Sequence, residues 1–345
     1  MADITNRKHD HLDLAIGGDV GFRKTPMFEC VELLHDALPE LSLDQIDTSV
    51  TILGKVLRAP IIIAAMTGGS ARALDINLEL ASIAEEFGYG FGVGSQRAML
   101  VNPDVAHSYS VRSVAPTTLL LGNLGGVQAS KLDSKAVANL VREVGADGLC
   151  IHLNPAMELV QPEGDRDFRG VLDALERLSR ELDVPIIAKE TGCGISPNVA
   201  RRLLDRGILH VDVSGAGGTS WVAVEMERIS SEQRDAVQVF RDWGIPTCAS
   251  VAYCAAVGLV TIIATGGIAT GVEIAQAIAM GAHAAGLARP VLKAFHAGGR
   301  EGAIQFLHRI ETELRMAMLL TAAGDIESLR KVERRVLSPL REWII

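Results

Sequence analysis

The chain has 345 residues, 48% of them hydrophobic, with 33 Lys and Arg against 42 Asp and Glu, so its net charge is −9. This acidic balance argues against nucleic acid or an anionic membrane as the main partner. No apolar run approaches the roughly 18 residues of a membrane span, and the start, MADITNRKHDHLDLA, has no signal-peptide core. Five scattered cysteines without a CxxC pair are typical of reduced thiols, so we expect a cytoplasmic protein.

The first 58 residues show no alternation of strands and helices. A charged start is followed by the turn-rich GGDVGFRKTP and by an amphipathic stretch around Val31–Leu41. We therefore expect residues 1–58 to form an extension that lies over one end of the main domain. Arg7, Lys8 and His11 make a small basic cluster in it, either a solvated tail or part of a site.

After Arg58, short apolar runs alternate with helical patterns, as in parallel βαβ units. Helices are predicted at Leu74–Phe87, Ser134–Val144 and Ser196–Arg206. Eight strands favour an α/β fold of the closed (β/α)8 TIM-barrel type over residues 59–300, with a doubly wound open sheet as the alternative. The predicted strands are Pro60–Ala65, Tyr89–Val93, Thr118–Gly122, Gly148–His152, Pro185–Lys189, Leu209–Val213, Thr261–Thr265 and Ala284–Ala288.

Two further segments stand out late in the chain. Residues 221–243 are longer and more polar than a usual βα loop, which predicts either a mobile lid or a surface insertion. Residues 301–345 are predicted to form two helices that close the barrel or join subunits.

The stretch Thr261–Pro290 contains, two times in succession, the pattern of an apolar strand followed by a loop and then a helix. Gly266 and Gly267 follow the first strand, and Arg289 follows the second. Glycine lets backbone N–H groups approach an anion, and the helix behind adds the positive end of its dipole. In such barrels the loops after the last two strands often bind phosphate. A tight turn with ordinary packing is the alternative.

Residues directly after the strands line one mouth of a β/α barrel, where catalytic groups are placed. In this chain they are nearly all polar or glycine, which indicates a site for a large, partly anionic cofactor. Individually, Thr67, Ser95 and Thr219 are also candidates for helix N-caps. The residues concerned are Met66–Gly69, Gly94–Arg97, Asn123, His152, Asn154, Lys189, Glu190, Ser214–Ser220, Gly266, Gly267, Ala288 and Arg289.

Three of these positions, and one residue that follows them, invite a specific interpretation. Lys189 ends an apolar strand, so it needs an anion, which is either a ligand atom or Glu190. His152 and Asn154 alternate along one strand and therefore point to the same face. Glu158 follows four residues later, and a carboxylate beside a diphosphate suits Mg²⁺; without such a ligand it is an ordinary loop acid.

With these residues assembled, the chain resembles the type 2 isopentenyl-diphosphate isomerase family nearly end to end. The stretches that carry the resemblance are NRKHDHLDLA, AAMTGGS, GVGSQRAML, GNLGG, HLNPAMELVQPEGDRDFRG, KETGCGIS, VSGAGGTSW, DWGIPT and ATGGIATG through GLARP. The resemblance implies an FMN-linked barrel that interconverts isopentenyl and dimethylallyl diphosphates with reduced FMN, Mg²⁺ and NADPH as reductant. It also implies a homo-oligomer, a tetramer or an octamer, in the cytoplasm.

Carried over residue by residue, the resemblance also implies a set of functional positions. His152, Asn154 and Met157 would line the reaction site, and Glu158 would hold Mg²⁺. The substrate diphosphate would be bound by Arg7, Lys8, His11, Ser95, Gln96 and Arg97. FMN would be bound by Ala65, Met66, Thr67, Ser95, Asn123, Lys189, Ser214 and Thr219, and its phosphate end by Gly267, Ile268, Ala269, Ala288 and Arg289.

The chain departs from the family pattern at two of these positions. Met157 occupies the place of Gln in the pattern His-x-Asn-x-x-Gln-Glu, and a thioether has no proton to give. Ala269 stands where relatives commonly have Arg. Three hypotheses follow: an isomerase, a flavoenzyme acting on another prenyl diphosphate with a pocket enlarged by Met157, and a silent flavin-binding protein.

Overall fold

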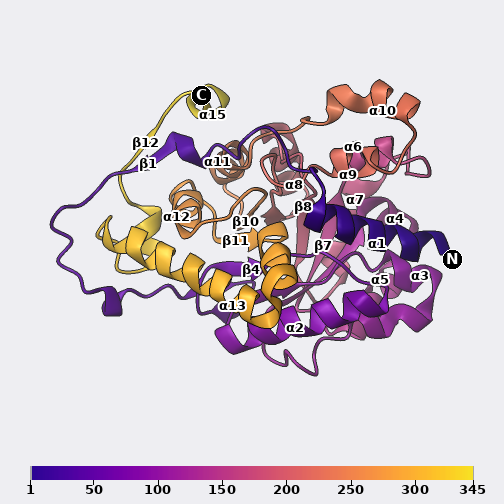
Figure 1. The fold of residues 1–345 in the computed structure, drawn as a ribbon, viewed down its shortest axis with the longest axis horizontal. Coiled ribbons are helices and arrows are strands. Elements are labelled where there is room, and N and C mark those ends of the chain that lie inside the picture. Colours follow the sequence, from indigo (N-terminus) through magenta and orange to yellow (C-terminus); the bar gives the residue numbers. More distant parts are fainter. Residues whose placement is uncertain (1, 345) are drawn as a thin grey trace.

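The computed structural model describes residues 2–344, with side chains for residues 8–344. Its centre is a closed barrel of eight parallel strands that run in order from β4 to β11, where β11 pairs with β4 (Figure 1). The predicted TIM barrel is confirmed, and closure excludes the open sheet. The strands, each on a predicted run, are β4 (Ile61–Ile63), β5 (Gly90–Gly92), β6 (Leu120–Gly125), β7 (Gly148–Leu153), β8 (Ile186–Glu190), β9 (His210–Asp212), β10 (Thr261–Thr265) and β11 (Ala284–Leu287).

Helices follow the strands and cover the outside of the barrel (Figure 1). The three predicted helices are confirmed; α2 begins three residues early because the Ser70 hydroxyl accepts the Ala73 N–H at its start. The helices are α2 (Ala71–Phe87), α3 (Arg97–Val101), α4 (Gly126–Lys131), α5 (Ser134–Val144), α6 (Pro155–Val160), α7 (Val171–Glu181), α8 (Pro197–Asp205), α9 (Trp221–Met226), α10 (Ser231–Val237), α11 (Thr247–Val257), α12 (Gly271–Ala279) and α13 (Arg289–Leu319).

The N-terminal extension contacts both ends of the barrel, not one. Helix α1 (Ala2–Gly17) lies near α9 and α13 at the mouth formed by the strands' carboxyl ends (Figure 1). The hairpin of β2 (Val50–Ile52) and β3 (Lys55–Leu57) closes the opposite end. Its Ile52 and Leu57 pack inside the barrel in one cluster with Ile62, Leu119, Leu121, Cys150, Ile187, Ile263 and Ala284.

The amphipathic stretch around residues 31–41 does not form one regular element. Only β1 (Val31–Leu33) is regular there, because its backbone pairs antiparallel with β12 (Arg334–Val336) from the far end of the chain. A local sequence pattern contains no information about such a distant partner. Residues 301–344 are also more varied than two helices: they comprise the end of α13, then α14 (Ile326–Arg330), β12 and α15 (Leu340–Ile344).

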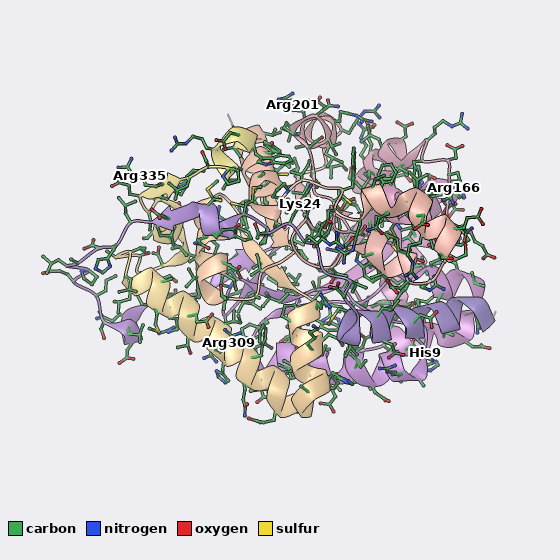
Figure 2. All side chains as sticks on the ribbon, turned by 45° about the horizontal axis from the view of Figure 1, so that its top comes forward. His9, Lys24, Arg166, Arg201, Arg309 and Arg335 are labelled. Atoms are coloured by element: carbon green, nitrogen blue, oxygen red, sulfur yellow. The ribbon has the colours of Figure 1, made fainter. Side chains whose placement is uncertain are left out.

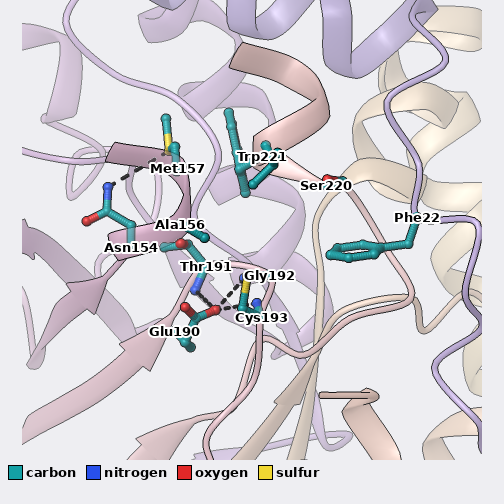
Figure 3. A pocket seen from close by; sticks show the side chains of 11 residues that line it. Phe22, Asn154, Ala156, Met157, Glu190, Thr191, Gly192, Cys193, Ser220 and Trp221 are labelled. Carbon is teal, nitrogen blue, oxygen red and sulfur yellow. Dashed lines mark hydrogen bonds between the residues drawn. The ribbon is translucent and has the colours of Figure 1, made fainter. Parts of the chain in front are cut away.

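Residues 221–243 form two short helices, α9 and α10, and a 3-10 turn at Gln238–Phe240. Trp221 begins α9 and faces a small pocket at the mouth (Figure 3). Helix α13 bends at Gly298 and Gly299, whose backbone angles are not helical, beside the predicted boundary at residue 300. Whether α9 and α10 act as a lid stays a prediction.

Arg201 and Arg335 are examples of charged side chains at the periphery of the molecule (Figure 2). The barrel strands are buried on nearly all positions, as expected when helices cover a parallel sheet. In the described part of the chain, no helix has both the length and the apolar content needed to cross a membrane.

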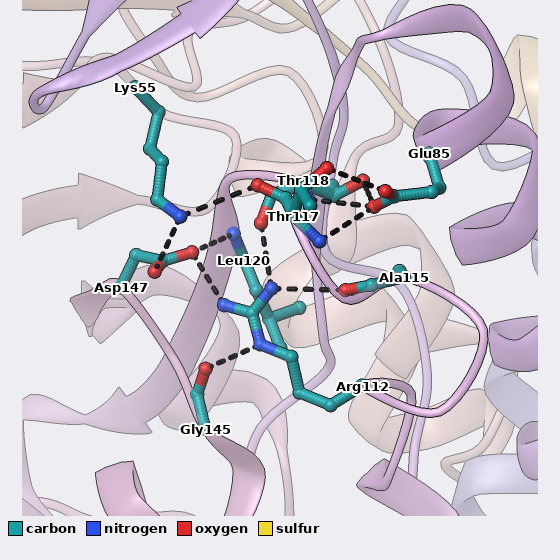
Figure 4. A network of polar contacts seen from close by, with 9 residues as sticks. All are labelled: Lys55, Glu85, Arg112, Ala115, Thr117, Thr118, Leu120, Gly145 and Asp147. Atoms are coloured by element: carbon teal, nitrogen blue, oxygen red, sulfur yellow. Dashed lines mark hydrogen bonds and ion pairs between the residues drawn. The ribbon is translucent and has the colours of Figure 1, made fainter.

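A polar network holds the loops at the closed end of the barrel together (Figure 4). Arg112 donates to the backbone oxygens of Gly145 at 2.7 Å and Thr118 at 2.8 Å, and its guanidinium pairs with Asp147 at 2.5 Å. Asp147 also pairs with Lys55 of the hairpin at 3.3 Å. One guanidinium therefore links the loop before β6 to the turn before β7 and, through Asp147, to the hairpin.

Replacing Arg112 with Ala removes the donors of several partly buried acceptors, so we expect the free energy of unfolding to fall by about 2–4 kcal/mol. Arg169→Ala is the matched control, since the Arg169 side chain is 90% exposed in its pair with Asp167, and removing so exposed a pair should leave the free energy of unfolding close to that of wild type. Urea unfolding measures both. Equal losses in the two variants would contradict the linking role of Arg112.

Candidate active site

A cavity of about 600 Å³ opens at the carboxyl ends of the barrel strands, beneath α1 and α9. Its wall is built from strand-end residues, many of them polar or glycine, together with side chains from α1, α6 and the start of α13. The predicted site residues that line it are Lys8, His11, Ala65, Met66, Thr67, Ser95, Arg97, Asn123, His152, Asn154, Met157, Glu158, Lys189, Ser214, Thr219, Gly267, Ile268, Ala288 and Arg289.

Two predicted site residues, Gln96 and Ala269, do not line the cavity, and a third cannot be placed from the described side chains. Gln96 is fully buried behind it, where its side-chain amide donates to Leu140 O at 2.8 Å and accepts the Asn123 N–H at 3.0 Å. Ala269 lies in the turn before α12, and its N–H donates to Glu273 at 2.8 Å. The side chain of Arg7 lies outside the described residues, although its backbone is part of α1.

Lys189 has a partner that the sequence analysis missed. Its ammonium bonds Asp212 Oδ2 at 2.5 Å, and both side chains are buried. The two residues are register partners on neighbouring strands β8 and β9. Glu190, one of the two predicted partners, is therefore not the partner of this lysine, which has an ion-pair partner within the protein. The sequence signal that could have identified this partner is the acidic residue within the mainly apolar run HVDVS.

His152 lies on the cavity wall as a neutral imidazole. Its Nδ1 is 2.8 Å from Asn123 Oδ1, so with that oxygen as acceptor Nδ1 carries the hydrogen and Nε2 is free of it. Burial, together with the nearby charges of Lys189 and Arg97, lowers the pKa of His152 to about 4. The ring is therefore uncharged at physiological pH.

Glu158 reaches the cavity from α6 with its orientation fixed from both sides. One carboxylate oxygen accepts from Asn154 Nδ2 at 2.9 Å, and the other accepts the Asp165 N–H at 2.8 Å. Met157 lies beside it, with Sδ 3.9 Å from the same Asn154 amide. No three His, Cys, Asp or Glu side chains gather into a metal site among the residues that the structure describes. A cation here would depend on Glu158, water and ligand oxygens.

Two buried hydroxyls at the cavity wall fit a polar ligand. Thr67 Oγ1 and Thr265 Oγ1 have no hydrogen-bond partner within the described structure. The helix caps nearby are Ser70 and Ser220, so Thr67 and Thr219 are not used as caps. Buried hydroxyls are almost always bonded, so these two indicate an acceptor or donor brought by a bound molecule such as FMN.

The predicted phosphate end combines close backbone packing with a basic side chain. Gly266 and Gly267 have φ of 113° and 86°, and a Cβ on Gly267 would lie 2.7 Å from the backbone of Gly217. Glycine is therefore required to bring two cavity loops together. Arg289, expected at the phosphate, also donates to the Ala15 and Gly18 carbonyls at 2.8 and 2.7 Å, so it ties the end of α1 to the same place.

A buried charge network fastens α1 over the cavity, and sequence reasoning missed it. Glu225 of α9 is fully buried and bonds His11 Nε2 at 2.8 Å and Arg228 at 2.7 Å. Burial alone raises the pKa of Glu225, but the bonds to His11 and Arg228 outweigh it and lower that pKa. Arg228 also pairs with Asp10 on α1 at 3.2 Å. Only the acid in the apolar run WVAVEM hinted at this contact.

A second, much smaller pocket adjoins the cavity across Met157 and Trp221 (Figure 3). Glu190 lies in its wall, and one of its oxygens accepts the N–H groups of Thr191 at 2.6 Å and Gly192 at 2.7 Å and that of Cys193. Burial raises the pKa of Glu190 to about 7, although the backbone N–H groups oppose the shift.

Known proteins resemble this chain at two levels. The FMN-dependent dehydrogenase family matches residues 154–336. A protein of Thermococcus kodakarensis named isopentenyl-diphosphate delta-isomerase is 46% identical over 98% of this chain and 93% of its own length. Proteins of the same name from Halobacterium salinarum and Methanothermobacter thermautotrophicus are 44% and 39% identical, over 98% and 99% of this chain and 95% and 96% of their own lengths.

Among solved structures, a mandelate oxidase variant with a monooxide FMN adduct superposes with a TM-score of 0.66 over 97% of this chain and 100% of its own. Its sequence identity is 18%, so this likeness supports the barrel fold and nothing finer.

The raised pKa of Glu190 predicts the direction in which folding stability changes with pH. Between about pH 4.5 and pH 7 the folded protein holds a proton on Glu190 that the unfolded chain releases, so this residue's contribution to stability falls as pH rises through that window. Glu190→Gln does not titrate there, so wild type should lose stability relative to this variant between pH 5 and pH 8, as urea unfolding would measure.

Glu85→Gln is the matched control, because the Glu85 pKa lies at about 2. Burial alone would raise that pKa, but bonds from Thr117 and Thr118 outweigh it. The contribution of Glu85 to stability is lost only as pH falls below about 4.5. The stability difference between wild type and Glu85→Gln should therefore stay constant from pH 5 to pH 8. If the stability difference between wild type and Glu190→Gln is also constant from pH 5 to pH 8, the pKa of Glu190 is not raised.

Proposed function

Because the chain belongs to the type 2, FMN-dependent isopentenyl-diphosphate delta-isomerase family, we propose that it interconverts isopentenyl and dimethylallyl diphosphates. The observation that carries the proposal is full-length similarity, 46% over 98% of the chain, to a protein of that name. Neither alternative, a diverged prenyl-diphosphate flavoenzyme or a silent flavin-binding protein, is favoured by these relatives.

The cavity supports FMN as the resident cofactor. When bound and reduced, FMN supplies a group that exchanges protons with the five-carbon substrate. The hydroxyls of Thr67 and Thr265 would each gain the hydrogen-bond partner that the protein does not provide. The phosphate end would lie against the backbone of Gly267 and Ile268, in front of the N-terminus of α12. Ala65, Met66, Ser95, Asn123, Lys189, Ser214, Thr219, Ala288 and Arg289 would complete the site.

The basic residues near α1 suit the substrate diphosphate. Lys8, His11, Ser95 and Arg97 line one side of the cavity, and Arg7 would join them from the same helix. A guanidinium can hold two phosphate oxygens at once, which favours Arg97 as the orienting group. Glu158 would hold Mg²⁺, which would counter the charge of the diphosphate, since Mg²⁺ is commonly bound by one or two carboxylates together with phosphate oxygens.

His152 and Asn154 would orient the reacting end of the substrate. A histidine with a pKa of about 4 stays neutral, so it adds a hydrogen-bonding group without a charge that would compete for the diphosphate. Asn154 would keep both the Glu158 carboxylate and the adjacent Met157 in place. Met157 itself provides apolar contact to the alkyl chain and no proton relay.

The reductant, the location and the oligomeric state complete the proposal. NADPH would serve as the reductant that primes the flavin. A cytoplasmic location is supported by the five cysteines, all free thiols. A homo-oligomer, tetramer or octamer, stays a prediction that light scattering on the purified protein would test.

The test is anaerobic turnover of isopentenyl diphosphate with FMN, NADPH and Mg²⁺, comparing wild type with Met157→Gln. We expect wild type to turn over slowly and the variant to gain kcat by up to about 10²-fold, because a positioned proton relay typically contributes 10²–10⁴-fold. KM should change little, since binding rests on the diphosphate groups. Met316→Gln, at a half-exposed position on α13, is the control for adding an amide elsewhere.

Two outcomes would contradict the proposal. If neither protein turns over isopentenyl diphosphate while both bind reduced FMN, the isomerase assignment fails. If wild type is inert and only Met157→Gln is active, the chain is an isomerase scaffold diverted to another prenyl diphosphate, and turnover of longer chains should then be measured.

A further inference from the structure

The ammonium of Lys8 is held at the cavity wall by a tyrosine outside the predicted site. Lys8 Nζ donates to Tyr109 Oη at 2.6 Å and to Ser95 O at 3.3 Å. The Tyr109 hydroxyl in turn donates to the same Ser95 oxygen at 2.7 Å. The ammonium also lies 5.2 Å from the centre of the Tyr109 ring. These contacts join α1 to the end of β5, at the side of the cavity that Arg97 lines.

The surroundings of Tyr109 are shaped for this contact. Tyr109 is fully buried at the end of the 3-10 helix Pro103–Tyr109. Gly68 and Gly69 pass directly over it: a Cβ on Gly68 would lie 2.1 Å from the Tyr109 ring, and one on Gly69 would lie 2.7 Å from Lys8 Nζ. A side chain at either glycine would displace the ring or the ammonium.

The same loop is anchored from below by side chains that do not face the cavity. Ser108 Oγ accepts the Gly69 N–H at 2.7 Å, and Asn77 Nδ2 donates to the backbone oxygens of Thr67 and Ser108 at 3.2 Å each. Tyr109 therefore sits on a rigid base that also carries Thr67. Burial raises the pKa of the Tyr109 hydroxyl, so it stays a neutral phenol that fixes the lysine without neutralising it.

We propose that Tyr109 is a positioning residue for the substrate diphosphate: its hydroxyl holds the Lys8 ammonium beside Ser95, so that the lysine is in place before the anion arrives. This inference rests on the proposed function, because it assigns the anion to the Lys8 side of the cavity. A flexible lysine loses rotamer freedom when it binds a ligand, and a tyrosine that orders it beforehand removes part of that cost.

The test measures binding of inorganic diphosphate to the FMN-loaded protein by titration calorimetry in the presence of Mg²⁺. Tyr109→Phe keeps the ring and deletes the hydroxyl, and we expect diphosphate affinity to fall about 10-fold, the cost of ordering one flexible side chain on binding. Tyr89→Phe is the matched control. Tyr89 is equally buried and bonds Glu311 at 2.7 Å away from the cavity, so its loss should leave diphosphate affinity unchanged.

A double-mutant cycle separates positioning from general support of the fold. In a Lys8→Met background, Tyr109→Phe should have no further effect on diphosphate affinity, because the group that it positions is gone. An undiminished 10-fold loss in that background would overturn the proposal, as would wild-type affinity in Tyr109→Phe alone.

Kinetics distinguish failure of this inference from failure of the proposed function. With isopentenyl diphosphate, Tyr109→Phe should raise KM about 10-fold and leave kcat near wild type. If wild type does not turn over but the calorimetric cycle behaves as predicted, the isomerase assignment fails and the role of Tyr109 stands. If kcat falls while KM is unchanged, Tyr109 does not position the diphosphate group.

Discussion

Closure of the sheet, by the pairing of β11 with β4, is the constraint on which the rest of the molecule depends. Parallel strands in a closed barrel bring all eight carboxyl ends to one mouth, so residues far apart in sequence meet there. The opposite end needs its own closure, which Ile52 and Leu57 of the β2–β3 hairpin supply. With one end filled by apolar side chains, the mouth is left for polar groups and the 600 Å³ cavity.

Burying charges at that mouth is costly unless each has a partner. The structure meets this requirement in three ways: Lys189 pairs with Asp212, Glu190 accepts backbone N–H groups, and Glu225 bonds His11 and Arg228. The last contact also fastens α1 to α9. Lys8 of α1, which bonds the backbone oxygen of Ser95, is held by the neutral phenol of Tyr109. The contacts that hold α1 at the mouth therefore lie beside the residues proposed to bind the ligands.

Much of this site was predictable because β/α periodicity locates the strand ends, and the strand ends locate the cavity. His152 and Asn154 were found in that way and do line it, as does Glu158, which only the family resemblance had marked as functional. The features that the sequence did not predict depend on contacts between residues distant in sequence. The pairing of β1 with β12, the bond between Lys189 and Asp212, and the burial of Gln96 behind the wall all depend on which segments the barrel brings together. The charge network of Glu225, His11 and Arg228 that fastens α1 to α9 was missed for the same reason.

The central claim is that this cavity binds FMN, with the FMN phosphate at the loops that follow β10 and β11, and a diphosphate beneath α1. A crystal structure of the protein with FMN and inorganic diphosphate tests it most directly. We expect the FMN phosphate on the backbone N–H groups near Gly267 and Ile268, a flavin or ribityl atom bonded to Thr67 or Thr265, and diphosphate beside Lys8 and Arg97. FMN bound elsewhere, or diphosphate bound away from Lys8, would contradict the account.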